Sequence, residues 1–579
     1  QYNTKRRLSM DKNFFLHPQD PMQRRYEILR AYFVEELNAE EVANRCDCSI
    51  HTVYGLLKQY RKKEEVNFFL PLKQGPKGHR PYVENLKEQA ISLRKRNYSI
   101  YEIEETLSRN VQRIAPKTID FILKEDGFSK LFRRTNAERL EALQARREYP
   151  EESSIQGFAT VPQVSTIYGG TFLFIPLILE LELDKLLQGI SFYGSKQIPS
   201  LNYLLSYLGL KLLGKERLCH IEDFNFDYGI GSFAGLNVLP KCAAITQYSY
   251  RNPGSLTVQL VKGFLKILHG RNLVKGNYIN LDFHSIPHYG DESQLQNNWI
   301  PTRGKSMKSI LSFFAQDLET TYLCYANADI EREESSDEVL KFVDFYNSTT
   351  GKLPHCLVFD SKLTTYRNMD TLNQKGILFI TLRNRGKYIH KKIAKIQEWE
   401  KVTIDNLKRK YKNLNAFSEL VDLKDYQGKI RQIIVTGTGR ELPMVLLTND
   451  KESTIKETIT TYTHRWLIEL NIGENVDFFN LNALSSPIVV KVNFDIAMTL
   501  IANTLYKLLV REIRKFQKSR PKTIFRSFIE SRAKIDIEKD LITVKFEKRS
   551  FNPLIMDWVR KRQNILVPWM GNRRLRFKF

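Results

Sequence analysis

Cysteine is scarce in this sequence, with six residues in 579. So few cysteines do not build a disulfide framework, which favours a reducing compartment such as the cytoplasm. Cys46, Cys48 and His51 are close together, but no second pair follows at the spacing of a zinc site. We therefore interpret the two cysteines as small apolar residues of a folded core.

Long hydrophobic runs are also missing. The longest, residues 171–179, meets Glu180 after about half the length that a membrane-spanning helix requires. The amino end, QYNTKRRLSMDKN, is polar and basic and does not resemble a secretory signal. The sequence therefore predicts a protein without a membrane partner.

Acidic residues are too few to balance the basic ones, with 65 Asp and Glu against 89 Lys and Arg and a formal net charge of +24. Such an excess is unfavourable in a compact protein unless a polyanion is bound, and nucleic acid is the commonest such partner. A hydrophobic content of 42% excludes a mainly disordered chain. Because 579 residues exceed one hydrophobic core, we expect several domains.

Residues 1–70 show the pattern of three short amphipathic helices. These segments begin near Pro21, Asn38 and Ser49, residue types that are typical of helix starts. Three such helices with a tight turn before the last are typical of a helix-turn-helix unit, whose last helix enters the major groove of DNA. A small helical bundle that contacts another protein is the alternative. On the DNA-binding hypothesis, the residues facing the bases are His51, Thr52, Tyr54 and Lys58.

Residues 83–134 repeat this pattern, and we expect a second helix-turn-helix unit there. Its last helix starts near Pro116. The candidate residues for DNA contact in this helix are Lys117, Thr118 and Lys124.

A segment rich in Pro and Gly, residues 71–82, connects the two predicted units. A basic strap of this kind fits a minor groove of DNA, and a solvated linker explains the composition equally well. The basic residues of the strap are Lys73, Lys77 and Arg80. A second, highly charged linker is expected at residues 135–157.

Two buried strands that each end in an aspartate mark the rest of the chain. After a helical region at residues 158–270, NYINLD ends at Asp282 and LPHCLVFD ends at Asp360. Strands alternate with helices around them, which predicts a mixed α/β sheet. Functional side chains gather at strand ends, where the backbone is fixed but the side chain reaches solvent. The two aspartates are therefore candidates for one carboxylate site.

The segment TYTHRWLIELNIGENVDFFNLNALSS has a helical period that places Tyr462, Arg465 and Glu469 on one side of a helix. These three residues match the first three positions of the motif Tyr-x2-Arg-x3-Glu-x6-Lys. The segment therefore resembles the signature of bacterial insertion-sequence transposases of the Asp-Asp-Glu class. The final Lys is absent because Val476 stands in its place. The resemblance covers about residues 275–505. Glu474, one turn beyond Glu469, is the alternative third carboxylate.

The resemblance implies an RNase H-like catalytic domain, residues 271–505, in which Asp282, Asp360 and Glu469 bind two Mg²⁺ ions, with Mn²⁺ as a substitute. Two such ions stabilise the attacking and leaving oxygens of an in-line displacement at phosphorus. Water would free a 3′-OH end, and that hydroxyl would then attack target DNA. Tyr462 and Arg465 would lie on the DNA, with Arg465 on a phosphate beside Glu469.

Two further regions accompany this predicted domain. Residues 387–455 contain a β-rich stretch that resembles an insertion between the second Asp and the Glu in several such transposases. The basic carboxyl region, residues 506–579, follows the domain; from residue 505 onwards the chain has 21 Lys and Arg against 7 Asp and Glu. Aromatic residues interleaved with these charges indicate a folded region.

The sequence thus predicts a multidomain α+β protein with two helix-turn-helix units, an RNase H-like mixed α/β domain and a basic carboxyl region. Its expected function is cut-and-paste transposition. The expected partners are double-stranded DNA, at the ends of a mobile element and at the target, and a second copy that forms a homodimer on DNA. The expected location is the bacterial nucleoid. The alternative function is a domesticated, sequence-specific DNA-binding protein with an inactive nuclease domain.

Overall fold

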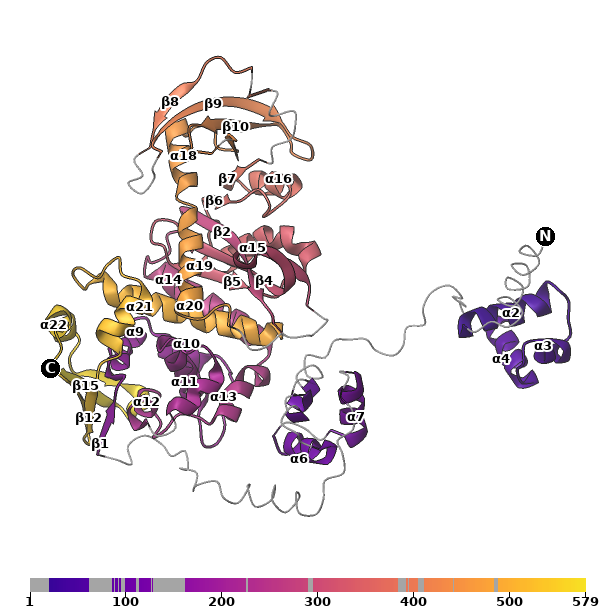
Figure 1. Cartoon of the computed structure of the whole chain (residues 1–579), viewed down its shortest axis with the longest axis horizontal. Coiled ribbons are helices and arrows are strands. Elements are labelled where there is room, and N and C mark those ends of the chain that lie inside the picture. The colour runs from indigo at the N-terminus through magenta and orange to yellow at the C-terminus, as the bar shows by residue number, and fades with distance from the viewer. Residues whose placement is uncertain are drawn as a thin grey trace. The chain divides into compact units, whose positions relative to one another are not determined.

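The structure is a computed structural model of the chain, which forms two compact units, residues 1–133 and 134–579 (Figure 1). It describes residues 20–61, residues 86–128 except 88, 92, 95–98, 111–113 and 126–127, and residues 162–579 except 225–226, 290–294, 384–391, 394, 405–410, 441 and 484–487. Lys73, Lys77, Arg80 and the predicted linker at residues 135–157 lie outside the described residues.

The first helical group consists of α2 (Pro21–Phe33), α3 (Ala39–Arg45) and α4 (Ile50–Arg61). Asp20 caps α2, since its side chain accepts the backbone N–H groups of Met22 and Gln23. Asn38 and Glu41 form a capping box at the start of α3. The three helices bury one small core: Ile28, Leu29, Ala31, Ala39, Val42, Ala43, Val53, Leu56 and Leu57.

The second helical group contains α6 (Ile100–Asn110) and α7 (Pro116–Glu125). Ile103 and Leu107 of α6 and Ile119 and Leu123 of α7 are buried in a second small core, as the helical period of three and four requires.

A ten-stranded mixed sheet organises the larger unit. Its strand order is β3-β4-β2-β6-β7-β11-β10-β9-β8, and β5 also pairs with β4. The parallel pairs are β2 with β6 and β6 with β7, and the other pairs are antiparallel. The strands are β2 (Tyr278–Pro287), β3 (Asn297–Ile300), β4 (Lys305–Asp317), β5 (Leu323–Asn327), β6 (Cys356–Phe359), β7 (Leu378–Leu382), β8 (Glu400–Thr403), β9 (Asn413–Asp422), β10 (Lys429–Thr436) and β11 (Met444–Thr448).

Helices pack on both faces of this sheet, as the side chains of β6 show. Leu357 and Phe359 share a core with α15 (Glu338–Thr350) and α16 (Tyr366–Gln374). Cys356 and Val358 point to the opposite face, where they pack in a cluster with α18 (Ile455–Thr463). The alternation follows from the period of two along a strand. It also explains why the described part of β6 is buried and apolar throughout.

A bundle of helices lies beside the sheet around the long, buried helix α20 (Val489–Arg511) (Figure 1). Its members contact α20 directly or through one another. They are α9 (Phe174–Glu180), α10 (Leu183–Gly189), α11 (Ser200–Leu212), α12 (Tyr228–Phe233), α13 (Cys242–Tyr248) and α14 (Gly254–Gly270).

The carboxyl region forms a second sheet of five strands in the order β1-β12-β13-β15-β14. Its strands are β1 (Gln163–Thr166), β12 (Ala533–Ile537), β13 (Leu541–Phe546), β14 (Ile565–Val567) and β15 (Arg573–Lys578), and α21 (Pro521–Ile524) and α22 (Asn552–Arg560) accompany them. β1 pairs with β12, in the register Val164 with Ile535. The basic carboxyl region is therefore a folded part of the larger unit.

Strand β2 continues to Pro287, so Asp282 lies within this strand, whereas the sequence predicted that the strand ends there. Four more details differ from the sequence-based expectations. The region expected to be helical, residues 158–270, contributes the strand β1 because Val164 and Thr166 bury one side of it. Helix α20 crosses the boundary expected at residue 505. The β-rich stretch at residues 387–455 extends the main sheet, since β11 pairs with β7.

The fourth difference concerns the signature segment, which forms two helices instead of one. Helix α18 ends at Thr463 and α19 (Trp466–Asp477) begins after Arg465. His464 and Arg465 keep right-handed backbone angles, but the N–H of His464 is shared between the carbonyls of Thr460 and Thr461, and that of Arg465 bonds three residues back, to Tyr462. The two helices consequently lie end to end (Figure 1). Among all described helices, none has the length and apolar character to cross a membrane.

Candidate active site

The strand register brings the two predicted aspartates together. In the parallel pair of β2 and β6, Tyr278 lies beside Cys356 and Asn280 beside Val358, a constant offset of 78 residues. The same offset relates Asp282 to Asp360, which directly follows β6. Neighbouring strands are about 4.8 Å apart, so the two carboxylates leave the sheet side by side. Because both occupy even positions, like Val358, they point to the face that α18 covers.

Glu469 reaches the same place from the first turn of α19. Arg465 connects the groups: its Nη1 atom lies 3.3 Å from Asp282 Oδ2, and its Nη2 atom is salt-bridged to Glu469 Oε1. The guanidinium also lies 6.0 Å from the ring centroid of Tyr462. The structure thus brings Asp282, Asp360, Tyr462, Arg465 and Glu469 into one site.

Buried amides hold α19 in position. Asn503 of α20 donates to Asn475 Oδ1 at 3.0 Å, and Asn471 donates to the carbonyl of Thr321 in the β4–β5 turn at 3.0 Å. Asn471 and Asn475 are both buried. Since buried amides need their hydrogen-bond partners, these contacts fix the rotation of α19 and hence the direction of Glu469.

The charges at this site perturb one another. Burial raises the pKa of Asp282 to about 6, Arg465 opposes this shift, and the nearby Glu469 and Asp360 carboxylates reinforce it. Burial acts to lower the pKa of Arg465, but Tyr462, Asp282 and Glu469 outweigh burial and raise it. Asp282 and Glu469 therefore share one guanidinium, and Asp360 adds a third acidic group near Asp282, a concentration of charge that is typical of a functional site.

Glu474, the alternative third carboxylate, faces elsewhere. Five residues along a helix turn the side chain by roughly 140° relative to Glu469. Burial raises the pKa of Glu474, and the nearby Lys507 and Arg520 oppose that shift. The groups that act on Asp282 are Arg465, Glu469 and Asp360. The geometry therefore favours Glu469 as the partner of the two aspartates.

The chemistry of these donors suits a hard divalent cation, because Mg²⁺ prefers carboxylate oxygens. Their arrangement is not yet that of a coordination shell: within the described ranges, no three Asp, Glu, His or Cys side chains are grouped closely enough to hold a metal. The Glu469 side chain is 53% exposed and is held towards Arg465. A change of its rotamer is the movement that would turn it from the guanidinium to a cation.

His284, two residues beyond Asp282, is fixed by a partner that the sequence did not indicate. Its Nε2 atom lies 2.7 Å from Asn482 Oδ1, and burial lowers its pKa. The contact orients the ring on the same face as Asp282, and Asn482 belongs to the segment that follows α19. The sequence contained Asn482 within the signature segment but gave no sign of this pairing.

The predicted DNA-reading residues lie on exposed helix faces of the smaller unit. His51, Thr52, Tyr54 and Lys58 are all exposed on α4, opposite its buried Val53 and Leu57. On α7, Lys117, Thr118 and Lys124 are also exposed, and Lys124 is paired with Asp120 at 2.7 Å. Both sets are accessible, as a DNA contact requires.

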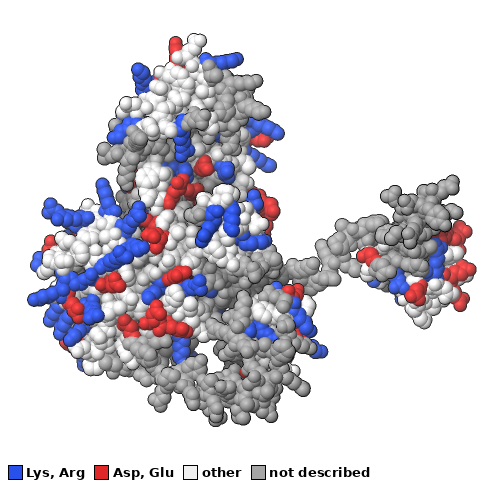
Figure 2. All heavy atoms as spheres, in the orientation of Figure 1, with Lys and Arg blue, Asp and Glu red and all other residues white. Residues whose placement is uncertain are grey.

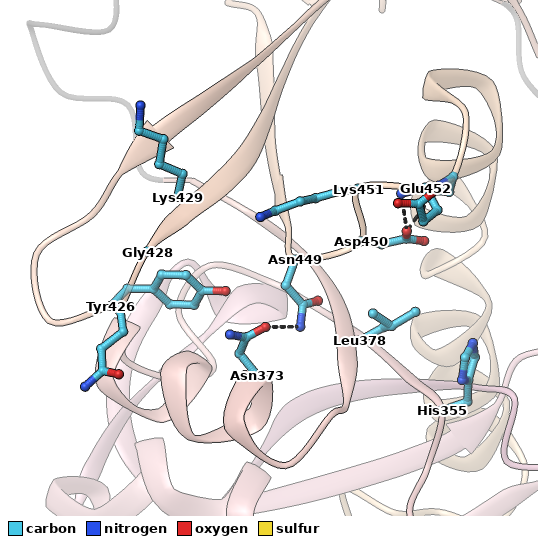
Figure 3. Close-up of a pocket in the computed structure, with 12 residues that line it drawn as sticks. His355, Asn373, Leu378, Tyr426, Gly428, Lys429, Asn449, Asp450, Lys451 and Glu452 are labelled. Atoms are coloured by element: carbon cyan, nitrogen blue, oxygen red, sulfur yellow. Dashed lines mark hydrogen bonds between the residues drawn. The ribbon is translucent and has the colours of Figure 1, made fainter.

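A separate pocket of about 720 Å³ lies at the other edge of the parallel strands (Figure 3). His355 directly precedes β6 and Leu378 begins β7, whereas Asp360 follows β6. Asn449 bridges the pocket wall, donating to Asn373 Oδ1 at 3.0 Å and to the carbonyl of Ile377 at 2.9 Å. The pocket is therefore distinct from the carboxylate site.

Comparison with known proteins adds no relative: neither a protein-family model nor a curated protein sequence matches this chain.

Proposed function

We propose that this protein is a DNA transposase of the Asp-Asp-Glu class, which binds the ends of its own mobile element, cleaves the DNA and joins the 3′-OH ends to target DNA. The observation that carries the proposal is the convergence of Asp282, Asp360 and Glu469 on one site, from two adjacent parallel strands and a helix. The match to Tyr-x2-Arg-x3-Glu supports it, because each residue of that motif lies at this site.

The order of the central strands also supports the proposal. Strands β2, β4 and β5 are antiparallel neighbours, and β6 and β7 continue the sheet in parallel from β2. This is the arrangement expected of an RNase H-like sheet, with the first Asp on its central strand. The exposed faces of α4 and α7 and the net charge of +24 favour duplex DNA as the substrate.

In the proposed reaction Asp282, Asp360 and Glu469 would hold Mg²⁺, with Mn²⁺ as a substitute, and two such ions would activate the attacking oxygen and stabilise the leaving oxygen. The protein's own residues position the DNA. Arg465 exchanges its carboxylate partners for a phosphate beside the scissile bond. Its planar guanidinium can donate two parallel hydrogen bonds to such a phosphate. Tyr462 packs against that guanidinium and limits its movement.

Cleavage of a plasmid that carries the gene with its flanking DNA tests the proposal. With Mg²⁺ the full chain should nick this plasmid, and Asp282→Asn, Asp360→Asn or Glu469→Gln should each abolish nicking while binding of the same DNA persists. Asp557→Asn is the matched control, since Asp557 of α22 is an acid whose side chain is 85% exposed and it does not line this site. Equal loss with Asp557→Asn, or loss with Glu474→Gln but not with Glu469→Gln, would contradict the assignment.

The same assay separates the alternative function. A domesticated DNA-binding protein would bind the flanking DNA and leave it intact under all metal conditions. Nicking by the wild type that disappears in the three carboxylate variants is the result that excludes it.

A further inference from the structure

A strongly basic turn joins α20 to the carboxyl region. Residues 511–522, here called the basic turn, read REIRKFQKSRPK and contain six Lys and Arg against one Glu. All six basic side chains are exposed. The lone Glu512 is paired with Arg562 at 2.8 Å, outside the turn. The turn therefore presents a concentrated positive charge, and Figure 2 shows Lys and Arg crowded over this side of the larger unit.

The basic turn has a fixed shape. Ile513 is fully buried, and the Phe516 ring packs on Phe528 with 4.9 Å between ring centroids. Lys515 has a positive φ of 72°, a conformation that is unfavourable for a residue with a long side chain and persists only where the surroundings impose it. Within the described part of the chain, Arg514, Lys515, Lys518 and Lys522 make no ion pair. An anchored segment thus holds several unneutralised cations outward.

The end of the basic turn faces the proposed active site across a groove of about 400 Å³. One wall is the exposed side of α19 with Trp466, Glu469 and Gly473, and the other contains Arg520 and Lys522. A Cβ atom added at Gly473 would meet nothing within 4 Å, so the α19 wall leaves room for a ligand. Glu469 therefore belongs both to the carboxylate site and to this groove.

Three acidic side chains, Glu469, Glu474 and Asp477, line the groove together with Arg520 and Lys522. Glu474 lies near the half-buried Lys507 of α20 as well as near Arg520. Asp477 is exposed at the rim. On α19 itself, the position where the transposase signature has a Lys is Val476, which packs on the hydrophobic core. Arg520 and Lys522 consequently supply positive charge next to Glu469 that α19 lacks.

We propose that this groove binds the sugar-phosphate backbone of the DNA strand that enters the carboxylate site, with Arg520 and Lys522 on its phosphates. The inference rests on the proposed function for the identity of the strand, but the groove itself requires only a polyanionic backbone. Exposed Arg and Lys bind phosphates through charge and counterion release, without reading sequence. Lys515 and Lys518 add two more exposed positive charges earlier in the same turn.

The test compares Arg520→Gln/Lys522→Gln with the wild-type full chain, using a short duplex of mixed sequence and a supercoiled plasmid. The slope of log affinity against log salt should fall by about 1.8, because each lost phosphate contact removes roughly 0.9. KM for Mg²⁺-dependent plasmid nicking should rise about tenfold with little change in kcat, because the bound substrate and the transition state lose the same contact. Lys534→Gln/Lys539→Gln, which removes two exposed charges from the carboxyl-terminal sheet, is the charge-matched control.

An unchanged salt slope and KM in Arg520→Gln/Lys522→Gln, or an equal loss in the control, would overturn the inference. The failure of the proposed function has a different signature: the wild type would not nick DNA with Mg²⁺. The salt slope still decides the inference in that case, because duplex binding does not require the carboxylates.

Discussion

A buried ion pair between α11 and α20 permits a quantitative prediction. Lys211 Nζ lies 2.6 Å from Asp495 Oδ2, and the two side chains are only 6% and 7% exposed. Tyr207 donates a second hydrogen bond to Asp495 at 2.9 Å. The pair joins the helical bundle to the helix that carries Asn503, which in turn holds α19.

Replacing Lys211 with Met leaves the Asp495 carboxylate buried without its cation. Removal of one partner from such a pair costs about 3–5 kcal/mol, because an uncompensated charge stays in a medium that solvates it poorly. The double variant Lys211→Met/Asp495→Asn removes both charges, and Asn still accepts the bond from Tyr207. We expect it to recover at least half of the loss.

Urea titration of the full chain, followed by tryptophan fluorescence and circular dichroism, measures these changes in the unfolding free energy of the larger unit. Lys185→Met is the matched control, since Lys185 and Glu182 form a pair that is 71% and 52% exposed. Exposed pairs contribute about 0–1 kcal/mol. The reasoning is refuted if Lys211→Met loses no more stability than Lys185→Met, or if the double variant is no more stable than the single one.

Three further predictions concern other parts of the molecule. A fragment covering residues 1–135 should bind the DNA that flanks the gene more tightly than scrambled DNA, with affinity falling steeply as salt rises in a titration of fluorescence anisotropy; equal binding to both DNAs would place recognition elsewhere. If a homodimer forms on DNA and each subunit cuts the DNA end that the other subunit binds, a mixture of the Asp282→Asn variant and a chain lacking residues 1–135 should cleave flanking DNA, although neither protein cleaves it alone. Cleavage by a strictly monomeric complex would contradict this. Gly170→Ala should lower the unfolding free energy by about 2–3 kcal/mol, because its Cβ would lie 2.0 Å from the Phe528 carbonyl oxygen, whereas Gly189→Ala meets open space and serves as the control.

Much of the candidate site was readable from short stretches of sequence. Asp282 and Asp360 each follow an apolar run that is long enough for a buried strand, although β2 continues past Asp282 to Pro287. The spacing of Tyr462, Arg465 and Glu469 was enough to predict that they share one side. These inferences succeed in placing the residues because strand and helix periods depend on neighbours in the chain.

Other features depend on contacts between distant segments. The helical period of the sequence continues through His464 and Arg465, so it does not indicate the break between α18 and α19. Arg520 and Lys522 approach α19 because Phe516 anchors the preceding residues on Phe528. No local pattern in the sequence encodes this contact. The sequence therefore indicated a basic carboxyl region without locating its charges beside Glu469.

The amino-acid sequence by itself determined the apolar strand segments that lead to Asp282 and Asp360 and the helical spacing that places Tyr462, Arg465 and Glu469 together. The tertiary structure alone decided that β11 pairs with β7, so that residues 400–448 extend one sheet, and that β1 pairs with β12, more than three hundred residues away. The physical reason is that a strand's alternation specifies its buried face, whereas its neighbour is selected by the packing of the whole core.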